Sequence, residues 1–140
     1  MSKEEKKRNP SPSKPNLLKY SVGSDISKDK FDACISSIDI NQEIKIVATR
    51  SFRNTQKGIE EFYKWGSTKF KHDIPVVFVV EATGVYYEKL AYFLHENGCN
   101  VSVVLPNRAK KYLLSIGVKS KNDKIDSKAL ARMGAEQDRK

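Results

Sequence analysis

The segment PVVFVVEATG at residues 75–84 joins a continuous apolar run to a single acid, Glu81. Such a run is typical of a β-strand that is buried on both faces of a sheet. An ionised carboxylate is costly to bury without a partner, so an acid at the end of a buried strand indicates a special environment. We therefore expect a functional site at the end of this strand.

The residues before this segment have the pattern of three β-strands, at 17–26, 31–38 and 43–52. They combine apolar residues with small or alternating polar ones. The turns between them, residues 27–30 and 39–42, are short, which favours an antiparallel meander.

Two helices are expected on either side of the apolar run, because apolar residues recur there at helical spacing. Thr83 can cap the second helix, and Gly98 ends it. Asn54 or Thr55 can cap the first helix, whose apolar stripe consists of Ile59, Phe62, Tyr63 and Phe70.

After Gly98 come a strand at residues 101–105, a helix that Pro106 opens, and a last helix at roughly residues 123–135. The order is therefore three strands, helix, strand, helix, strand and two helices. This order predicts an α/β fold of the ribonuclease H-like type, a mixed five-stranded sheet with helices on both faces. In such sheets the functional crevice lies beside the ends of the central strands.

Four acids are the candidate site residues: Asp25, Glu81, Asp123 and Asp126. Asp25 and Glu81 each lie near the end of an expected strand, so they converge if these strands are neighbours. Asp123 and Asp126 are three residues apart, which places them on one face of the last helix. Acids at a helix N-terminus are also common for capping alone. Together the four suit a site for hard divalent cations. Enzymes that cut or join phosphodiesters commonly use such cations beside a basic surface.

Four segments carry a resemblance to a known family: GSDISKDKFD at 23–32, EATGVYYEKLAYFL at 81–94, VSVVLPNRAKKY at 101–112 and KSKNDKIDSKALARM at 119–133. They resemble the N-terminal domain of IS110-family transposases, the DEDD transposases with a RuvC-like domain. The last segment, a basic stretch followed by D-x-x-D-x-x-x-L-A, is the most specific.

The resemblance implies a ribonuclease H/RuvC-like fold in residues 17–140. It implies Mg²⁺-dependent cleavage and rejoining of DNA in the transposition of an insertion sequence, with Mn²⁺ as a possible substitute. A structured guide RNA and, at full length, a homo-oligomer are the partners that it implies besides DNA. The DEDD tetrad that would bind the metal is Asp25, Glu81, Asp123 and Asp126.

Members of that family continue into a C-terminal domain that carries a nucleophilic serine, whereas this sequence ends at Lys140. We therefore expect the serine-bearing domain to be absent and the isolated chain not to be a competent recombinase. Ser115, Ser120 and Ser127 are expected to be surface or capping residues.

The basic charge indicates a polyanionic partner. Residues 1–16 hold five basic and two acidic residues, so most of the net charge of +9 lies in the rest of the chain. Phosphate contacts by such residues give affinity without reading the base sequence, although a Lys-rich solvated face is an ordinary alternative. The candidate nucleic-acid contacts are Lys28, Arg108, Lys110, Lys111, Lys119, Lys121 and Lys124.

Composition limits the remaining classes. Residues 1–16 are rich in charge, Pro and Ser, which predicts a disordered basic tail. No apolar run approaches the roughly 20 residues of a membrane span, and the N-terminus lacks a signal-peptide core. We expect a cytoplasmic, nucleoid-associated prokaryotic protein.

Cys34 and Cys99 belong to no CxxC pair, so reduced thiols are expected rather than a zinc site.

Two other functions fit the same residues. One is a stand-alone Holliday-junction resolvase or ribonuclease H-like nuclease, which would cleave nucleic acid without a further domain. The other is a non-catalytic binding or dimerisation module whose carboxylates bind no metal. The transposase domain and the stand-alone nuclease both require binding of Mn²⁺ or a similar ion, whereas the non-catalytic module does not, so a test of Mn²⁺ binding separates them.

Overall fold

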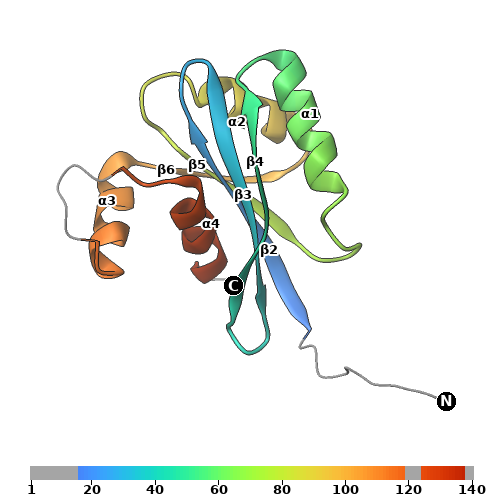
Figure 1. Ribbon diagram of the computed structural model, residues 1–140, viewed down its shortest axis with the longest axis vertical. Coiled ribbons are helices and arrows are strands. Elements are labelled where there is room, and N and C mark those ends of the chain that lie inside the picture. The colour runs from blue at the N-terminus through green and yellow to red at the C-terminus, as the bar shows by residue number, and fades with distance from the viewer. Residues whose placement is uncertain (1–15, 119–123, 138–140) are drawn as a thin grey trace.

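The computed structural model describes residues 16–118 and 124–137 (Figure 1). Five strands form one mixed sheet in the order β4-β3-β2-β5-β6. β2, β3 and β4 are the antiparallel meander that the sequence predicts, and β5 and β6 continue the sheet parallel to β2. The strand bounds are β2 Leu17–Ile26, β3 Lys30–Asp39, β4 Ile44–Arg53, β5 Val76–Glu81 and β6 Asn100–Val104.

The turn between β3 and β4 is held by one side chain. The Oδ1 atom of Asp39 accepts hydrogen bonds from the backbone N–H groups of Asn41 and Glu43. Gln42 takes a positive φ of 66° to close the turn. An acid that bonds backbone amides a few residues ahead is a common way to stabilise a short turn.

Helices cover both faces of the sheet, as the sequence predicts. α1 and α2 pack on one face, where Ile59, Phe62, Leu90 and Leu94 join the strand residues in one core. α3 and α4 pack on the opposite face, where a second core forms with residues of β5 and β6. The helix bounds are α1 Gln56–Ser67, α2 Glu88–Glu96, α3 Pro106–Ser115 and α4 Ser127–Glu136. In Figure 1, α1 and α2 lie on one side of the sheet and α3 and α4 on the other.

The first core is aromatic. Phe62 of α1 makes edge-on contacts with Phe31, Phe52 and Phe78 of three different strands, with ring centroids 5.2, 5.5 and 6.0 Å away. Such edge-to-face pairs add to the stabilisation that comes from burying apolar area. This packing fixes α1 against the meander, so the opposite face is built on a rigid sheet.

α4 lies directly on the central strand because two glycines allow it. A β-carbon on Gly23 would lie 2.3 Å from the carbonyl oxygen of Ser127. A β-carbon on Gly134 would lie 2.2 Å from the Oγ atom of Ser21. Neither position can carry a side chain without moving the backbone or the neighbouring residue. The two glycines therefore set the depth at which α4 sits on β2.

The predicted start of the last helix is wrong. The structure begins α4 at Ser127, because Asp126 has an extended backbone and accepts a hydrogen bond from the Ala129 N–H. This N-cap satisfies an amide that the first helical turn leaves free. Ile125, just before the cap, is 2% exposed and belongs to the second core. Asp126 is thus the N-cap of α4 and not a residue within the helix.

Two smaller expectations also need correction. Thr55 caps α1 as predicted, but α1 ends at Ser67, and Phe70 packs on Tyr20 from the following turn. Thr83 does not cap α2, whose N-cap is Tyr87 and carries no side-chain bond. β6 is only partly buried because it is an edge strand.

Across the described ranges 16–118 and 124–137, no helix has the length and apolarity to cross a membrane.

Candidate functional site

Asp25 and Glu81 are brought together by the pairing of β2 with β5. The parallel register pairs Gly23 with Val79 and Ser24 with Val80, so the next residues along the two strands are Asp25 and Glu81. Side chains alternate between the faces of a strand, and Gly23 and Val79 face α4. Both acids therefore point to the α4 face, at the carboxyl ends of the two central parallel strands. The predicted convergence of these two acids follows from this register.

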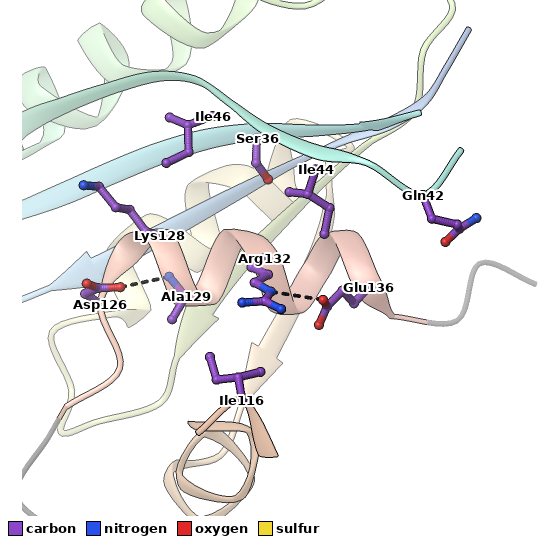
Figure 2. Close-up of a pocket in the computed structure, with 10 residues that line it drawn as sticks. All are labelled: Ser36, Gln42, Ile44, Ile46, Ile116, Asp126, Lys128, Ala129, Arg132 and Glu136. Atoms are coloured by element: carbon purple, nitrogen blue, oxygen red, sulfur yellow. Dashed lines mark hydrogen bonds and ion pairs between the residues drawn. The ribbon is translucent and has the colours of Figure 1, made fainter. Parts of the chain in front are cut away.

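Asp126 lies on the same face but is turned toward its own helix. Its Oδ1 atom accepts the Ala129 N–H at 2.8 Å, as Figure 2 shows. It stands at one end of a groove of about 590 Å³ between α4 and the β3–β4 hairpin. Asp25 and Glu81 do not line this groove, which is lined by Ser36, Gln42, Ile44, Ile46, Ile116, Asp126, Lys128, Ala129, Arg132 and Glu136.

Asp123 lies outside the described residues, as do Lys119 and Lys121. The arrangement of the full predicted tetrad therefore stays a prediction. Among the residues whose placement is described, no three His, Cys, Asp or Glu side chains are grouped so that they could hold a metal ion.

A cation does lie beside Asp25, and it belongs to the chain itself. The Nζ atom of Lys124 is 3.0 Å from Oδ1 of Asp25, and the two side chains are 54% and 25% exposed. Lys124 lies in the short segment that leads into α4. This ion pair therefore ties the start of that helix to the end of β2.

Asp32 is a further acid of this region that the sequence reasoning missed. It pairs directly with Asp25 across the antiparallel β2–β3 ladder, so the two side chains share the α4 face. Like charges directly opposite each other in a sheet repel. Asp32 accepts a hydrogen bond from the Ser51 hydroxyl, and the Lys30 ammonium lies 3.8 Å away. The sequence signal that could have found Asp32 is the short turn after Ile26, because a short turn limits how β2 and β3 can pair. The turn alone does not tell which residue of β3 lies opposite Asp25.

The donor chemistry of this region fits a hard divalent cation. Carboxylate oxygens are the ligands that Mg²⁺ prefers, and Asp25 and Glu81 present two of them side by side. Asp126 can cap α4 through one oxygen and still offer the other. The Lys124 ammonium shows that a positive charge is accommodated at Asp25.

Cys34 lies under the same helix in a setting that keeps its thiol unreactive. It pairs with Gly23 in the β2–β3 ladder and is fully buried. Burial raises the pKa of the Cys34 thiol to about 11; the nearby Lys128 opposes this shift and the Asp126 carboxylate reinforces it. Within the described residues Cys34 and Cys99 form no disulfide.

The predicted basic residues fall on two elements. Lys28 is exposed in the turn after β2, close in sequence to Asp25. Arg108, Lys110 and Lys111 are exposed on α3, a helix that contains no acid. Arg108 and Lys111 line a hollow between α3 and α4, whereas Lys110 is not part of its lining. The three cations of α3 therefore do not all face one groove.

Solved structures identify the fold class. The chain superposes on Thermus thermophilus RuvC with a TM-score of 0.55 and 12% identity, covering 83% of this chain and 92% of that one. It superposes on the fowlpox virus resolvase, solved with substrate Holliday junction DNA, with a TM-score of 0.53 and 18% identity, covering 84% and 97%. The predicted fold is confirmed: this is a RuvC/ribonuclease H-like α/β domain.

The family is identified by sequence. Residues 22–140 match the family model of DEDD transposases of the IS110 type, described as transposase. The chain belongs to this transposase family. A curated relative, the pilin gene-inverting protein of Moraxella bovis, is 34% identical over 121 residues, which cover 86% of this chain and 36% of the relative. The chain thus spans about a third of that relative's length.

Proposed function

We propose that this chain is the metal-binding catalytic domain, residues 17–140, of a DNA transposase of an insertion sequence. The observation that carries the proposal is the position of Asp25 and Glu81. They are neighbours at the carboxyl ends of the two central parallel strands, on the face where α4 begins. That location is where open α/β sheets place their ligand sites, and the chain belongs to a transposase family.

In this proposal Asp25, Glu81, Asp123 and Asp126 hold Mg²⁺, and Mn²⁺ can substitute. When bound, such ions supply an activated nucleophile and stabilisation of the leaving oxygen in phosphodiester cleavage and rejoining. The sheet register positions Asp25 and Glu81, and the close seat of α4 on Gly23 positions Asp126.

DNA would be held by the cations that flank these acids. Lys28 follows Asp25, and Arg108, Lys110 and Lys111 lie on α3, on the same face of the sheet as α4. Lysine and arginine contacts to phosphates supply affinity and fix orientation without reading sequence. Lys119, Lys121 and Lys124 would extend this surface.

For the whole transposase we propose DNA rearrangement at the nucleoid, in the prokaryotic cytoplasm. A relative named for gene inversion supports rearrangement as the reaction class. A structured guide RNA and a homo-oligomer at full length belong to the same proposal, and so does a nucleophile supplied by a serine-bearing domain outside this sequence.

Calorimetric titration with Mn²⁺ tests the metal site on the chain as it stands. We expect binding by the wild type and its loss in Asp25→Asn and in Glu81→Gln. Glu96→Gln is the matched control, because Glu96 is an exposed acid at the end of α2 on the opposite face of the sheet. Absence of Mn²⁺ binding by the wild type would point to a non-catalytic module instead.

A stand-alone Holliday-junction resolvase is the second candidate. It is favoured by one observation, that the matched region covers nearly the whole fold of the fowlpox virus resolvase. This candidate requires Mn²⁺-dependent cleavage of a synthetic four-way junction by the isolated chain. Cleavage that Asp25→Asn abolishes would select the resolvase over a domain that depends on a serine from another domain.

A further inference from the structure

The ion pair between Lys124 and Asp25 lies at an acid to which the proposed function assigns a divalent cation. The Lys124 ammonium lies 3.0 Å from Oδ1 of Asp25, and Asp25 is the better buried partner. Its side chain is 25% exposed, against 54% for Lys124. One end of this pair is thus fixed by the sheet, and the other is a flexible side chain open to solvent.

The surrounding charges explain why Asp25 needs this partner. Asp32 lies directly opposite it on β3, and Glu81 lies beside it on β5. Asp32 already has Lys30 and the Ser51 hydroxyl as partners. Among the cations that the structure describes, Lys124 is the one that forms an ion pair with Asp25. Lys124 therefore offsets the repulsion among these carboxylates when no other cation is present.

A divalent cation bound to Asp25 and the Lys124 ammonium beside the same carboxylate would oppose each other electrostatically. Two positive charges within a few ångströms of one oxygen repel strongly in a partly buried place. A lysine suits an exchangeable partner because its charge is a single point on a flexible stem. An arginine would hold the carboxylate through two parallel hydrogen bonds and release it less readily.

We propose that Lys124 is a displaceable internal counter-ion of the metal site. It neutralises Asp25 in the metal-free protein, leaves when a divalent cation binds, and is then free to contact a DNA phosphate. This inference rests on the proposed function in one respect, that Asp25 holds a divalent cation. It adds that the chain's own lysine competes with that cation.

Mn²⁺ titration of variants at residue 124 tests the competition, with heat and paramagnetic resonance as readouts that require no catalysis. In 0.15 M KCl we expect Lys124→Met to bind Mn²⁺ about twofold to fivefold more tightly than the wild type, the scale of one partly exposed ion pair. Lys124→Arg should bind Mn²⁺ no more tightly than the wild type. Lys57→Met is the matched control, an exposed lysine on α1 across the sheet, and should change the affinity by less than about twofold because salt screens it.

Equal or weaker Mn²⁺ binding by Lys124→Met would mean that Lys124 only anchors the start of α4, and the inference would be wrong while the metal site stands. An equal gain in Lys57→Met would also overturn it, because general charge would then explain the effect. Lys124→Gln repeats the test if Lys124→Met does not fold. Failure of both the wild type and Lys124→Met to bind Mn²⁺ would overturn the proposed metal site together with the inference.

Discussion

Gly23 lies so close to Ser127 that a β-carbon on residue 23 would be 2.3 Å from the Ser127 carbonyl oxygen. The same β-carbon would be 2.4 Å from the backbone nitrogen of Ala131. Backbone atoms cannot swing away as a side-chain end can. The depth at which α4 packs on β2, and with it the distance between Asp126 and the strand acids, therefore depends on the absence of a β-carbon at residue 23, as it does at Gly134.

Gly23→Ala is expected to lower the free energy of unfolding by about 2 kcal/mol, as overpacking of a well-packed core does. Urea unfolding followed by circular dichroism measures the change. Gly66→Ala is the control, because its new β-carbon would meet only the Phe70 ring at 3.4 Å and alanine favours a helix by up to about 1 kcal/mol over glycine. Equal stability of Gly23→Ala and the wild type would show that α4 sits further from the sheet.

Substitutions of Asp126 separate its two roles. Asp126→Ala removes the cap of α4 and should lower the free energy of unfolding by about 1 kcal/mol, whereas Asp126→Ser keeps a capping oxygen and should stay near the wild type. Both variants lose the carboxylate, so both should bind Mn²⁺ more weakly. Thermal unfolding measures the change in stability, and Mn²⁺ titration of the same samples measures the change in metal affinity. Unchanged Mn²⁺ affinity in Asp126→Ser would reduce Asp126 to a helix cap.

The buried Cys34 thiol predicts a loss of stability at high pH. Its pKa is about 11 in the folded chain because burial disfavours the thiolate, while the ordinary pKa of a cysteine thiol is 9.0. Between these two values the unfolded chain has released the proton and the folded chain has kept it. Stability therefore falls as pH rises through this range, with a slope that approaches about 1.4 kcal/mol per pH unit.

The contribution of Cys34 is isolated by comparison with Cys34→Ala. Urea unfolding at pH 8, 9 and 10 should show a shallower decline for the variant, because other groups titrate equally in both proteins. Labelling with a thiol reagent at pH 8 should be slow for Cys34 until urea unfolds the chain. Parallel pH profiles for the two proteins would contradict the raised pKa.

The α3 cations are expected to contact DNA phosphates. Replacing Lys110 and Lys111 by Glu should weaken binding of duplex DNA and lower the slope of log affinity against log salt by about 0.9 for each phosphate that is no longer neutralised. Fluorescence anisotropy at several salt concentrations measures both quantities. Lys57→Glu is the control, an exposed lysine on α1 across the sheet. A slope that the double variant leaves unchanged would remove α3 from the DNA surface.

Local patterns were enough to predict most of the fold. The bounds of β2 are those predicted, and those of β3 and β4 differ from the prediction by one residue at each end. Alternation, short turns and a continuous apolar run are properties of neighbouring residues, so they can be read along the chain. The start of α4 was missed because Asp123 and Asp126 are both good N-caps. Which of the two caps the helix depends on the burial of Ile125 in the second core, to which segments far apart in the sequence contribute.

The sequence by itself determined the order of the elements, the resemblance to IS110-type transposases and the acids Asp25 and Glu81 as candidates. Only the tertiary structure decided that Asp32 lies opposite Asp25 and that Lys124 forms an ion pair with Asp25. The reason is physical: strand register and the close seat of a helix on glycines are set by contacts between segments far apart in the chain. Those contacts, rather than residue types, determine which charges meet.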